Sequence, residues 1–173
     1  MSLHFEVYYV RTASIPPDRD FIYANRLLRV LGLEAGEFFL AKQNNDSPDI
    51  NDNNCRHYSG MVGECIYIGI QDNVGLFHYE HWKEGVLQRI LSYNSDYSWH
   101  HVEGKPEQWE REILFSEDRL NDAISCYDEE MHGVIRAAWE ARQIHEGDQF
   151  PAIFEMDAYG GLVSLIEKNQ LRF

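Results

Sequence analysis

The sequence predicts a single α+β domain, in which a curved antiparallel β-meander sheet is packed on one face by helices. Residues 64–102 form four runs with strand-like alternation, separated at short, even intervals by turn-forming residues. Residues 106–169 instead carry apolar side chains at helical spacing. Strands grouped early and helices grouped late are typical of an α+β domain. A chain of 173 residues suits one domain with one core.

Residues 1–42 predict a strand, a helix and a second strand. The first strand is indicated by apolar residues at every second position from Leu3 to Tyr9. Two prolines suit a helix start near residue 16, apolar residues follow at helical spacing, and Gly32 is placed to cap the end. Residues 37–41 predict a short second strand.

Residues 43–60 predict a mobile Asn/Asp-rich loop, because residues 43–54 hold five Asn and three Asp, which favour turns. Asp49, Asn51 and Asn53 stand at alternate positions, as in a calcium-binding EF-hand loop. The match fails further along, since Asn54 replaces the required glycine and Gly60 replaces the bidentate glutamate. We expect no metal here.

The four strands of the meander can be aligned if each turn has two residues, at 72–73, 84–85 and 94–95. Lys83 then faces Val86 and Tyr93 faces Asp96, which fixes the remaining pairs. In that register Glu80 lies opposite Arg89, and Arg89 lies opposite His100. His81, Gln88 and His101 form the next row, on the other face. That face is expected to form the core, with Ile66, Ile68, Phe77, Tyr79, Ile90 and Trp99.

The outer face of the expected sheet carries the candidate ligand-binding residues, which are His78, Glu80, Trp82, Arg89, Tyr93 and His100. A carboxylate, a guanidinium and an imidazole in one row are suited to an anionic or amide-bearing ligand. The same row is also a common cross-strand charge ladder, and the sequence leaves both interpretations open.

Metal binding is not expected at the histidine pair. His100 and His101 are neighbours in a strand and so point to opposite faces. The chain also lacks the HExxH, HxH and CxxC spacings of metal sites. We expect no cofactor.

The helical part, residues 106–169, begins with a short helix at 107–115. Ser116 is placed to cap the next helix, and helical phase then continues to Arg142. Whether residues 117–146 form one helix or two, broken at Gly133, stays open. Residues after Gly161 predict a last short helix.

The net charge of -14 repels phosphate backbones and anionic lipids, so we expect neither nucleic acid nor a membrane as partner. Residues 103–148 hold 13 acidic and 5 basic side chains. This segment is either a solvated helix face or a docking face for a basic protein.

A cytoplasmic location is expected, because three cysteines cannot all be paired in disulfides. The first residues also lack the pattern of a signal peptide, and no uncharged apolar run approaches 18 residues.

The predicted function is a non-enzymatic binding or protein-interaction module, because no catalytic motif occurs beside the strong charge. It would bind a basic protein or a small ligand. One alternative is a small enzyme with acid-base and anion-binding groups at Glu80, Arg89 and His100. Another is a subunit of a homo-oligomer that uses the sheet face as its interface.

Overall fold

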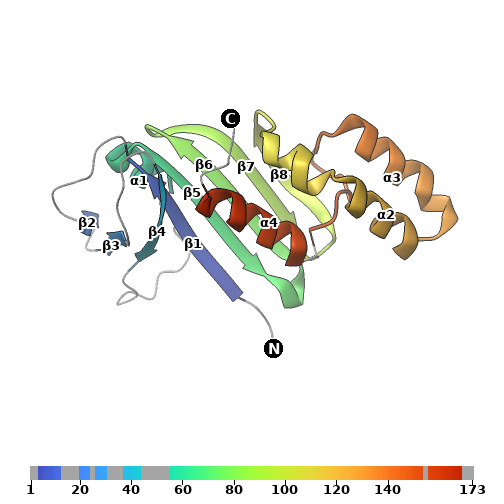
Figure 1. The fold of residues 1–173 in the computed structure, drawn as a ribbon, viewed down its shortest axis with the longest axis horizontal. Coiled ribbons are helices and arrows are strands. Elements are labelled where there is room, and N and C mark those ends of the chain that lie inside the picture. The colour runs from blue at the N-terminus through green and yellow to red at the C-terminus, as the bar shows by residue number, and fades with distance from the viewer. Residues whose placement is uncertain are drawn as a thin grey trace.

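An antiparallel sheet of eight strands, in the order β2-β3-β4-β1-β5-β6-β7-β8, forms the body of the computed structural model (Figure 1). The structure describes residues 4–12, 20–23, 26–30, 37–43, 55–153 and 156–168. The strands are β1 (His4–Arg11), β2 (Asp20–Tyr23), β3 (Arg26–Val30), β4 (Phe38–Gln43), β5 (Glu64–Gln71), β6 (Leu76–Lys83), β7 (Val86–Asn94) and β8 (Ser98–Gly104). The outermost strands are β2 and β8, so the sheet is open.

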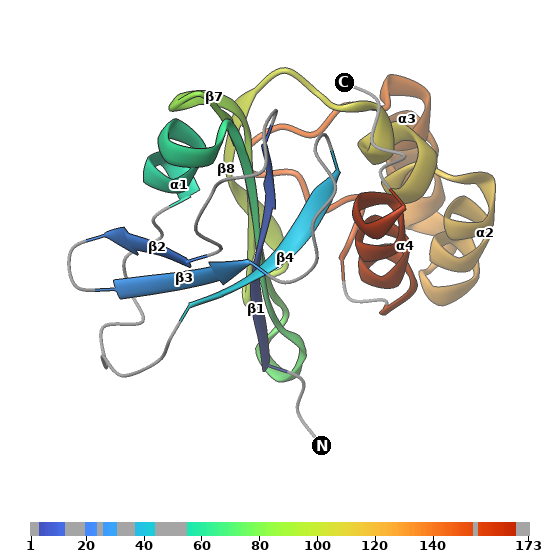
Figure 2. The same ribbon diagram turned by 60° about the vertical axis from the view of Figure 1, so that its left-hand side comes forward.

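The helices lie on both sides of this sheet. They are α1 (Cys55–Val62), the 3-10 turn η1 (Asp72–Val74), the π-helical turn η2 (Glu110–Leu114), α2 (Glu117–Cys126), α3 (Glu129–Ala141) and α4 (Met156–Glu167). Figure 2 shows α2, α3 and α4 on one side of the sheet and α1 on the other. Within the described ranges, no helix is long and apolar enough to cross a lipid bilayer.

The main core lies between the sheet and the helices that follow it. Alternate residues of β5 and β6, such as Ile66, Ile68 and Tyr79, belong to one buried cluster with Trp109, Ile135 and Leu162 from the helical half. A second, smaller cluster lies on the opposite face, where Cys55, Tyr58 and Val62 of α1 pack on β1 and β5. Large apolar surfaces are thereby buried on both faces, and this burial stabilises the layered arrangement.

The structure confirms the predicted fold class, a single α+β domain with helices packed on an antiparallel sheet. The prediction that helices cover one face needs correction, because α1 packs on the opposite face. The four predicted meander strands correspond to β5, β6, β7 and β8, and the short strand at 37–41 corresponds to β4.

The helix predicted near residues 16–32 is wrong, because β2 and β3 occupy this region. Phe21 pairs with Leu28 and Ile22 with Leu27, and β3 continues the sheet beside β4. Aromatic and β-branched residues fit such paired strands, and cross-strand pairing outweighs the helical spacing of the apolar positions.

The loop predicted over residues 43–60 is also wrong in its second part, where the structure has α1. Cys55, Tyr58 and Val62 are buried at positions i, i+3 and i+7, which is the spacing of an apolar helix stripe. Residues 44–54 lie outside the described residues.

Residues 117–146 contain two helices, but the break falls at Tyr127 and Asp128 and not at Gly133. Both residues of the break have extended backbones, and Asp128 stands at the N-cap of α3 before Glu129 and Glu130. The last helix likewise begins at Met156, ahead of the predicted start after Gly161.

Two β-bulges overturn the predicted register of the meander. Lys83 does pair with Val86, but the register shifts next to His81, so that Arg89 faces His81 instead of Glu80. The extra residue on β7 is Gln88. A bulge of one residue moves all later side chains to the other face of the sheet.

The second bulge lies on β8, where Tyr93 pairs with Trp99 and Ser92 pairs with His101. His100 is therefore the extra residue. The preceding turn is one residue longer than predicted, with Tyr97 at φ 64°, which is typical of three-residue hairpin loops.

At Gly104 the backbone of β8 approaches the backbone of β7 closely. Gly104 has φ +86°, and an added Cβ would lie 2.0 Å from the carbonyl oxygen of Gln88. Only glycine fits both the backbone conformation and this contact.

We predict that Gly104→Ala lowers the free energy of unfolding by about 2 kcal/mol or more, because it forces the two strands apart. Gly133→Ala is the control: it lies inside α3 with open space around its Cβ, and should raise stability by about 0.5–1 kcal/mol. Urea unfolding of both variants tests this. Equal stability of Gly104→Ala and the wild type would show that the two strands do not approach closely at Gly104.

Candidate ligand-binding site

Three of the sequence-predicted site residues do come together on the outer face of the sheet. The carboxylate of Glu80 accepts a hydrogen bond from Trp82 Nε1 at 2.7 Å and lies 2.8 Å from His78 Nε2. The guanidinium of Arg56, from α1, lies 5.7 Å from the ring centre of Trp82. Both carboxylate oxygens of Glu80 are therefore engaged by neighbouring side chains of the protein.

Arg89 and Tyr93 lie on the opposite, helix-covered side, because the bulge at Gln88 reverses the phase of β7. Each is only 1% exposed. Tyr93 packs edge to face on Trp99 in the main core. Tyr93 also lines, with His78, a hollow of about 210 Å³ at the end of the sheet near η1.

His100, on the bulge of β8, is 46% exposed and contacts Asp96 at 2.6 Å. Glu80, Arg89 and His100 therefore do not form one row or one site. The predicted acid-base and anion-binding arrangement of these three residues is wrong, since it assumed turns of two residues and strands without bulges.

A different histidine, His81 of β6, holds the most distinctive group of polar side chains. Its Nε2 lies 2.8 Å from Glu64 Oε1, and its Nδ1 lies 2.5 Å from Glu107 Oε1. His81 is 1% exposed, and the two glutamates are 4% and 7% exposed. One imidazole thus links β5, β6 and the segment that follows β8.

Both carboxylates are fixed by further donors. Arg11 of β1 contacts Glu64 Oε2 through Nε and Nη2, both at 2.7 Å. Glu107 Oε2 accepts hydrogen bonds from the hydroxyl of Tyr79 at 2.6 Å and from Trp109 Nε1 at 2.7 Å. We call Glu64, His81 and Glu107 the buried triad.

The geometry of the buried triad favours a protonated imidazole, because both ring nitrogens face a carboxylate. An ionised carboxylate only accepts hydrogen bonds, so each ring nitrogen that faces one must carry a proton. Burial alone lowers the pKa of His81, but the hydrogen bonds and charges of Glu107 and Glu64 outweigh it and raise the pKa above the usual value. Burial raises the pKa of Glu64, but His81 and Arg11 outweigh it and lower the pKa.

A second ion pair lies beside the triad and anchors the same segment. Arg89 Nε and Nη2 bind the two carboxylate oxygens of Glu110 at 2.9 and 2.7 Å, and Glu110 Oε1 accepts the backbone N–H of Glu107 at 2.8 Å. Arg89 Nη1 also donates to the carbonyl of Gly104 at 3.1 Å. With protonated His81, the three glutamates are balanced by three cationic groups, which is how charges can be buried at tolerable cost.

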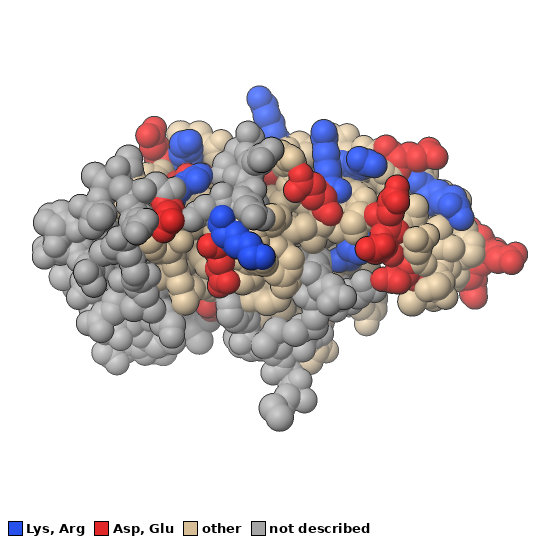
Figure 3. All heavy atoms as spheres, in the orientation of Figure 1, with Lys and Arg blue, Asp and Glu red and all other residues tan. Residues whose placement is uncertain are grey.

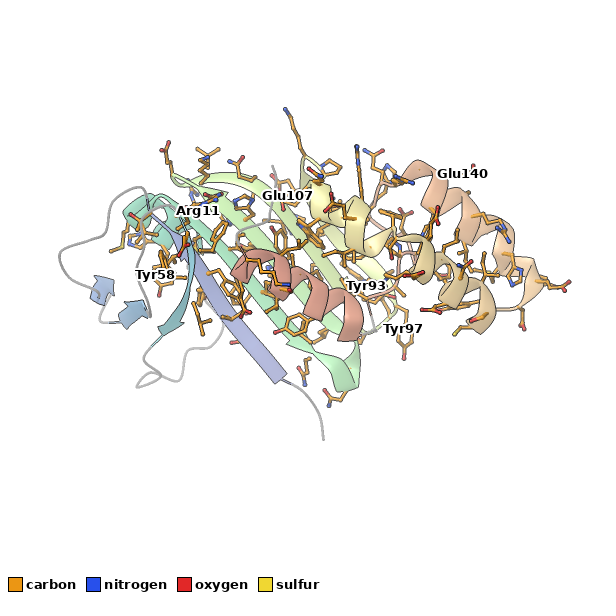
Figure 4. All side chains as sticks on the ribbon, viewed as in Figure 1. Arg11, Tyr58, Tyr93, Tyr97, Glu107 and Glu140 are labelled. Atoms are coloured by element: carbon orange, nitrogen blue, oxygen red, sulfur yellow. The ribbon has the colours of Figure 1, made fainter. Side chains whose placement is uncertain are left out.

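The buried triad forms the floor of a pocket of about 260 Å³. The lining residues are Glu64, His81, Lys83, Gln88, Lys105, Pro106, Glu107 and Gln108. Figure 4 shows Arg11 and Glu107 at one end of the strands, whereas Tyr93 lies towards the other end. The pocket is therefore separate from the hollow that His78 lines.

The pocket is better suited to binding than to proton transfer. A general base needs a free ring nitrogen within reach of its substrate, and both nitrogens of His81 are engaged. In the part of the chain that the structure describes, no group of three His, Cys, Asp or Glu side chains is arranged to hold a metal ion.

Glu64, His81 and Glu107 were not among the predicted site residues, although the sequence carries a signal for two of them. Glu64 and His81 share the phase of Ile66 and Tyr79, which the alternation assigns to the core side. A charged group on a core face needs a buried partner. Glu107 was harder to find, because its contact with His81 spans 26 residues and depends on the path of the chain after β8.

Comparison with protein-family models, with curated proteins and with solved structures finds no match for this chain. The function must therefore be inferred from the site itself.

We predict that His81 makes stability depend on pH in a definite direction. Its folded-state pKa is raised, so its stabilising contribution is complete below about pH 6.5 and is lost as pH rises through the folded-state pKa. Glu64, whose pKa is lowered, contributes above its usual value and loses its contribution only in acid. The difference in unfolding free energy between wild type and His81→Gln should shrink above pH 6.5, by at most about 1.4 kcal/mol per pH unit.

Urea unfolding between pH 5.5 and 8.5 measures this difference, with Gln143→Ala, an exposed position without a titratable group, as a control that should run parallel to the wild type. A gap between wild type and His81→Gln that stays constant or widens above pH 6.5 would show that the imidazole is not held protonated.

Proposed function

We propose that the protein is a non-enzymatic binding protein that holds a small polar ligand in the pocket above the buried triad. The proposal is supported by a pocket whose floor is a charge-balanced network of buried side chains. At its mouth Lys83 and Lys105 are exposed, and neither makes an ion pair within the described residues. Sites with fixed polar groups that converge on a cavity are typical of small-ligand binding.

The size of the pocket limits the ligand. Drug-sized ligands occupy pockets of about 300–1,000 Å³, so a cavity of about 260 Å³ suits a molecule with few heavy atoms. Since the triad and the Arg89–Glu110 pair fix the floor, such a ligand meets a pre-formed site, which lowers the ordering cost of binding.

A cytoplasmic location is part of this proposal. Cys55, Cys65 and Cys126 all carry free thiols, which is usual for proteins of a reducing compartment.

We predict that a panel of small polar compounds, screened by ligand-observed NMR, contains binders of this pocket. Gln108→Trp should abolish their signals, because the larger side chain fills the pocket mouth. Gln143→Trp, a similar change at an exposed position of the chain that does not line the pocket, should preserve them. The proposal fails if no compound binds, or if binding survives in Gln108→Trp.

A second candidate function, binding of a basic protein, is favoured by the charge on α2 and α3. Figure 3 shows acidic side chains gathered at the right-hand end of the molecule, over these helices. The seven carboxylates of residues 116–142 are exposed and take part in no salt bridge among the described residues; they belong to Glu117, Asp118, Asp122, Asp128, Glu129, Glu130 and Glu140. Unbalanced charge of one sign steers partners of the other sign.

This second candidate is tested with two triple variants of equal net charge. Asp122→Asn/Glu130→Gln/Glu140→Gln changes α2 and α3, and Glu37→Gln/Glu84→Gln/Glu103→Gln changes the sheet region. For a captured and purified basic partner, the first variant should weaken binding at least tenfold at low salt and the second by less than threefold. Equal losses in both variants, or an acidic partner, would exclude a specific docking face.

The proposal of a homo-oligomer built on the outer sheet face has less support. Trp82 lies on that face but is bonded to Glu80, and Tyr93 is buried in the main core.

A further inference from the structure

The mouth of the pocket is positively charged, in contrast to the protein as a whole. The chain has only four lysines and a net charge of -14, yet two of the lysines line this pocket. Lys83 lies directly opposite Glu64 in the register of β5 and β6. The carboxylate of Glu64 is nevertheless bound by Arg11 and His81, which leaves the ammonium group of Lys83 available to an anion.

Lys105 follows Gly104, the residue at which β8 approaches β7 closely, and lines the pocket. Both lysines are exposed, and neither is within salt-bridge distance of a described carboxylate. Two ammonium groups at one pocket mouth are suited to a carboxylate, whose two oxygens can accept from both.

The floor of the pocket instead favours a hydrogen-bond donor from the ligand, because its carboxylate oxygens are hydrogen-bond acceptors. Glu107 Oε2 takes two hydrogen bonds, and Glu64 Oε2 takes one from Arg11 Nε and is ion-paired with Arg11 Nη2, but Glu64 Oε1 and Glu107 Oε1 each take one, from His81. A carboxylate oxygen has two lone pairs, so each of these inner oxygens can accept one more donor. The ring N–H groups of His81 are already used, so the triad cannot donate to a ligand.

From this polarity we propose that the ligand is a small zwitterion of the α-amino acid class. Its carboxylate would lie between Lys83 and Lys105 at the mouth, and its protonated amine would bind the free lone pairs of Glu64 Oε1 or Glu107 Oε1 at the floor. This inference rests on the proposed function, because it names the ligand of the same pocket.

Other ligand classes fit the pocket less well. A dianion would meet two carboxylates at the floor, and a simple cation would meet two lysines at the mouth. An apolar molecule would remove water from these charged groups without replacing the hydrogen bonds. A ligand with a carboxylate at one end and a protonated amine at the other satisfies both ends.

The test is isothermal titration calorimetry of the full chain with the twenty standard amino acids, first in pools and then singly. The best ligand is compared with its analogue without the amine and with its analogue without the carboxylate; for L-alanine these are propionate and ethylamine. Each analogue should bind at least tenfold more weakly than the amino acid.

Substitutions of the two lysines at the pocket mouth test where the carboxylate of the ligand binds. Lys83→Gln and Lys105→Gln change exposed side chains and should each weaken the amino acid at least tenfold. Their effect on ethylamine should be absent or slightly favourable, because they remove repulsion. Lys168→Gln, at an exposed lysine beyond α4, should leave all affinities unchanged.

The outcomes separate this inference from the proposed function. If compounds of the wider panel bind in the pocket but no amino acid does, or if propionate-type acids bind as tightly as the amino acids, the zwitterion is wrong and the pocket remains a binding site. If neither the compounds of the wider panel nor any amino acid binds to the pocket, both proposals are wrong.

Discussion

A single buried imidazole, hydrogen-bonded to two buried carboxylates, connects parts of this protein that are far apart in the sequence. His81 reaches Glu64 at the start of β5 and Glu107 after the end of β8. The cost of burying these charges is offset only while all members are present, since removing one partner leaves an uncompensated charge in the interior. The path of the chain from β8 into η2 depends on this network, as does the floor of the pocket.

The network also explains why the sheet is irregular where it is. The bulge at Gln88 turns Arg89 into the helix-covered side, where it binds Glu110 and caps the end of β8. Without the bulge, Arg89 would face outward and the carboxylate of Glu110 would be buried alone. A local departure from regular pairing therefore allows two ion pairs to anchor one segment, and bulges of this kind are frequent beside functional sites.

The fold class and the four meander strands could be predicted from the sequence, because alternation and turn residues act locally. The faces of β7 and β8 could not, because each strand contains a one-residue bulge that is invisible to periodicity and reverses the phase beyond it. For this reason His78, Glu80 and Trp82 were grouped correctly within one strand, whereas Arg89 and Tyr93 were placed on the wrong face. Glu107 joins the site only through a long-range contact. Residues 20–30 show the reverse case, since helical spacing was outweighed by pairing of β3 with β4.

We infer that His81 is an imidazolium at neutral pH. NMR of the wild-type protein with nitrogen-15-labelled histidine measures the protonation state of each ring nitrogen. The His81 signals can be assigned by their loss in His81→Gln. We expect both ring nitrogens of His81 to carry a proton at pH 7, because the hydrogen bonds and charges of Glu107 and Glu64 raise its pKa. A neutral His81 at pH 7, with one ring nitrogen unprotonated, would contradict the account.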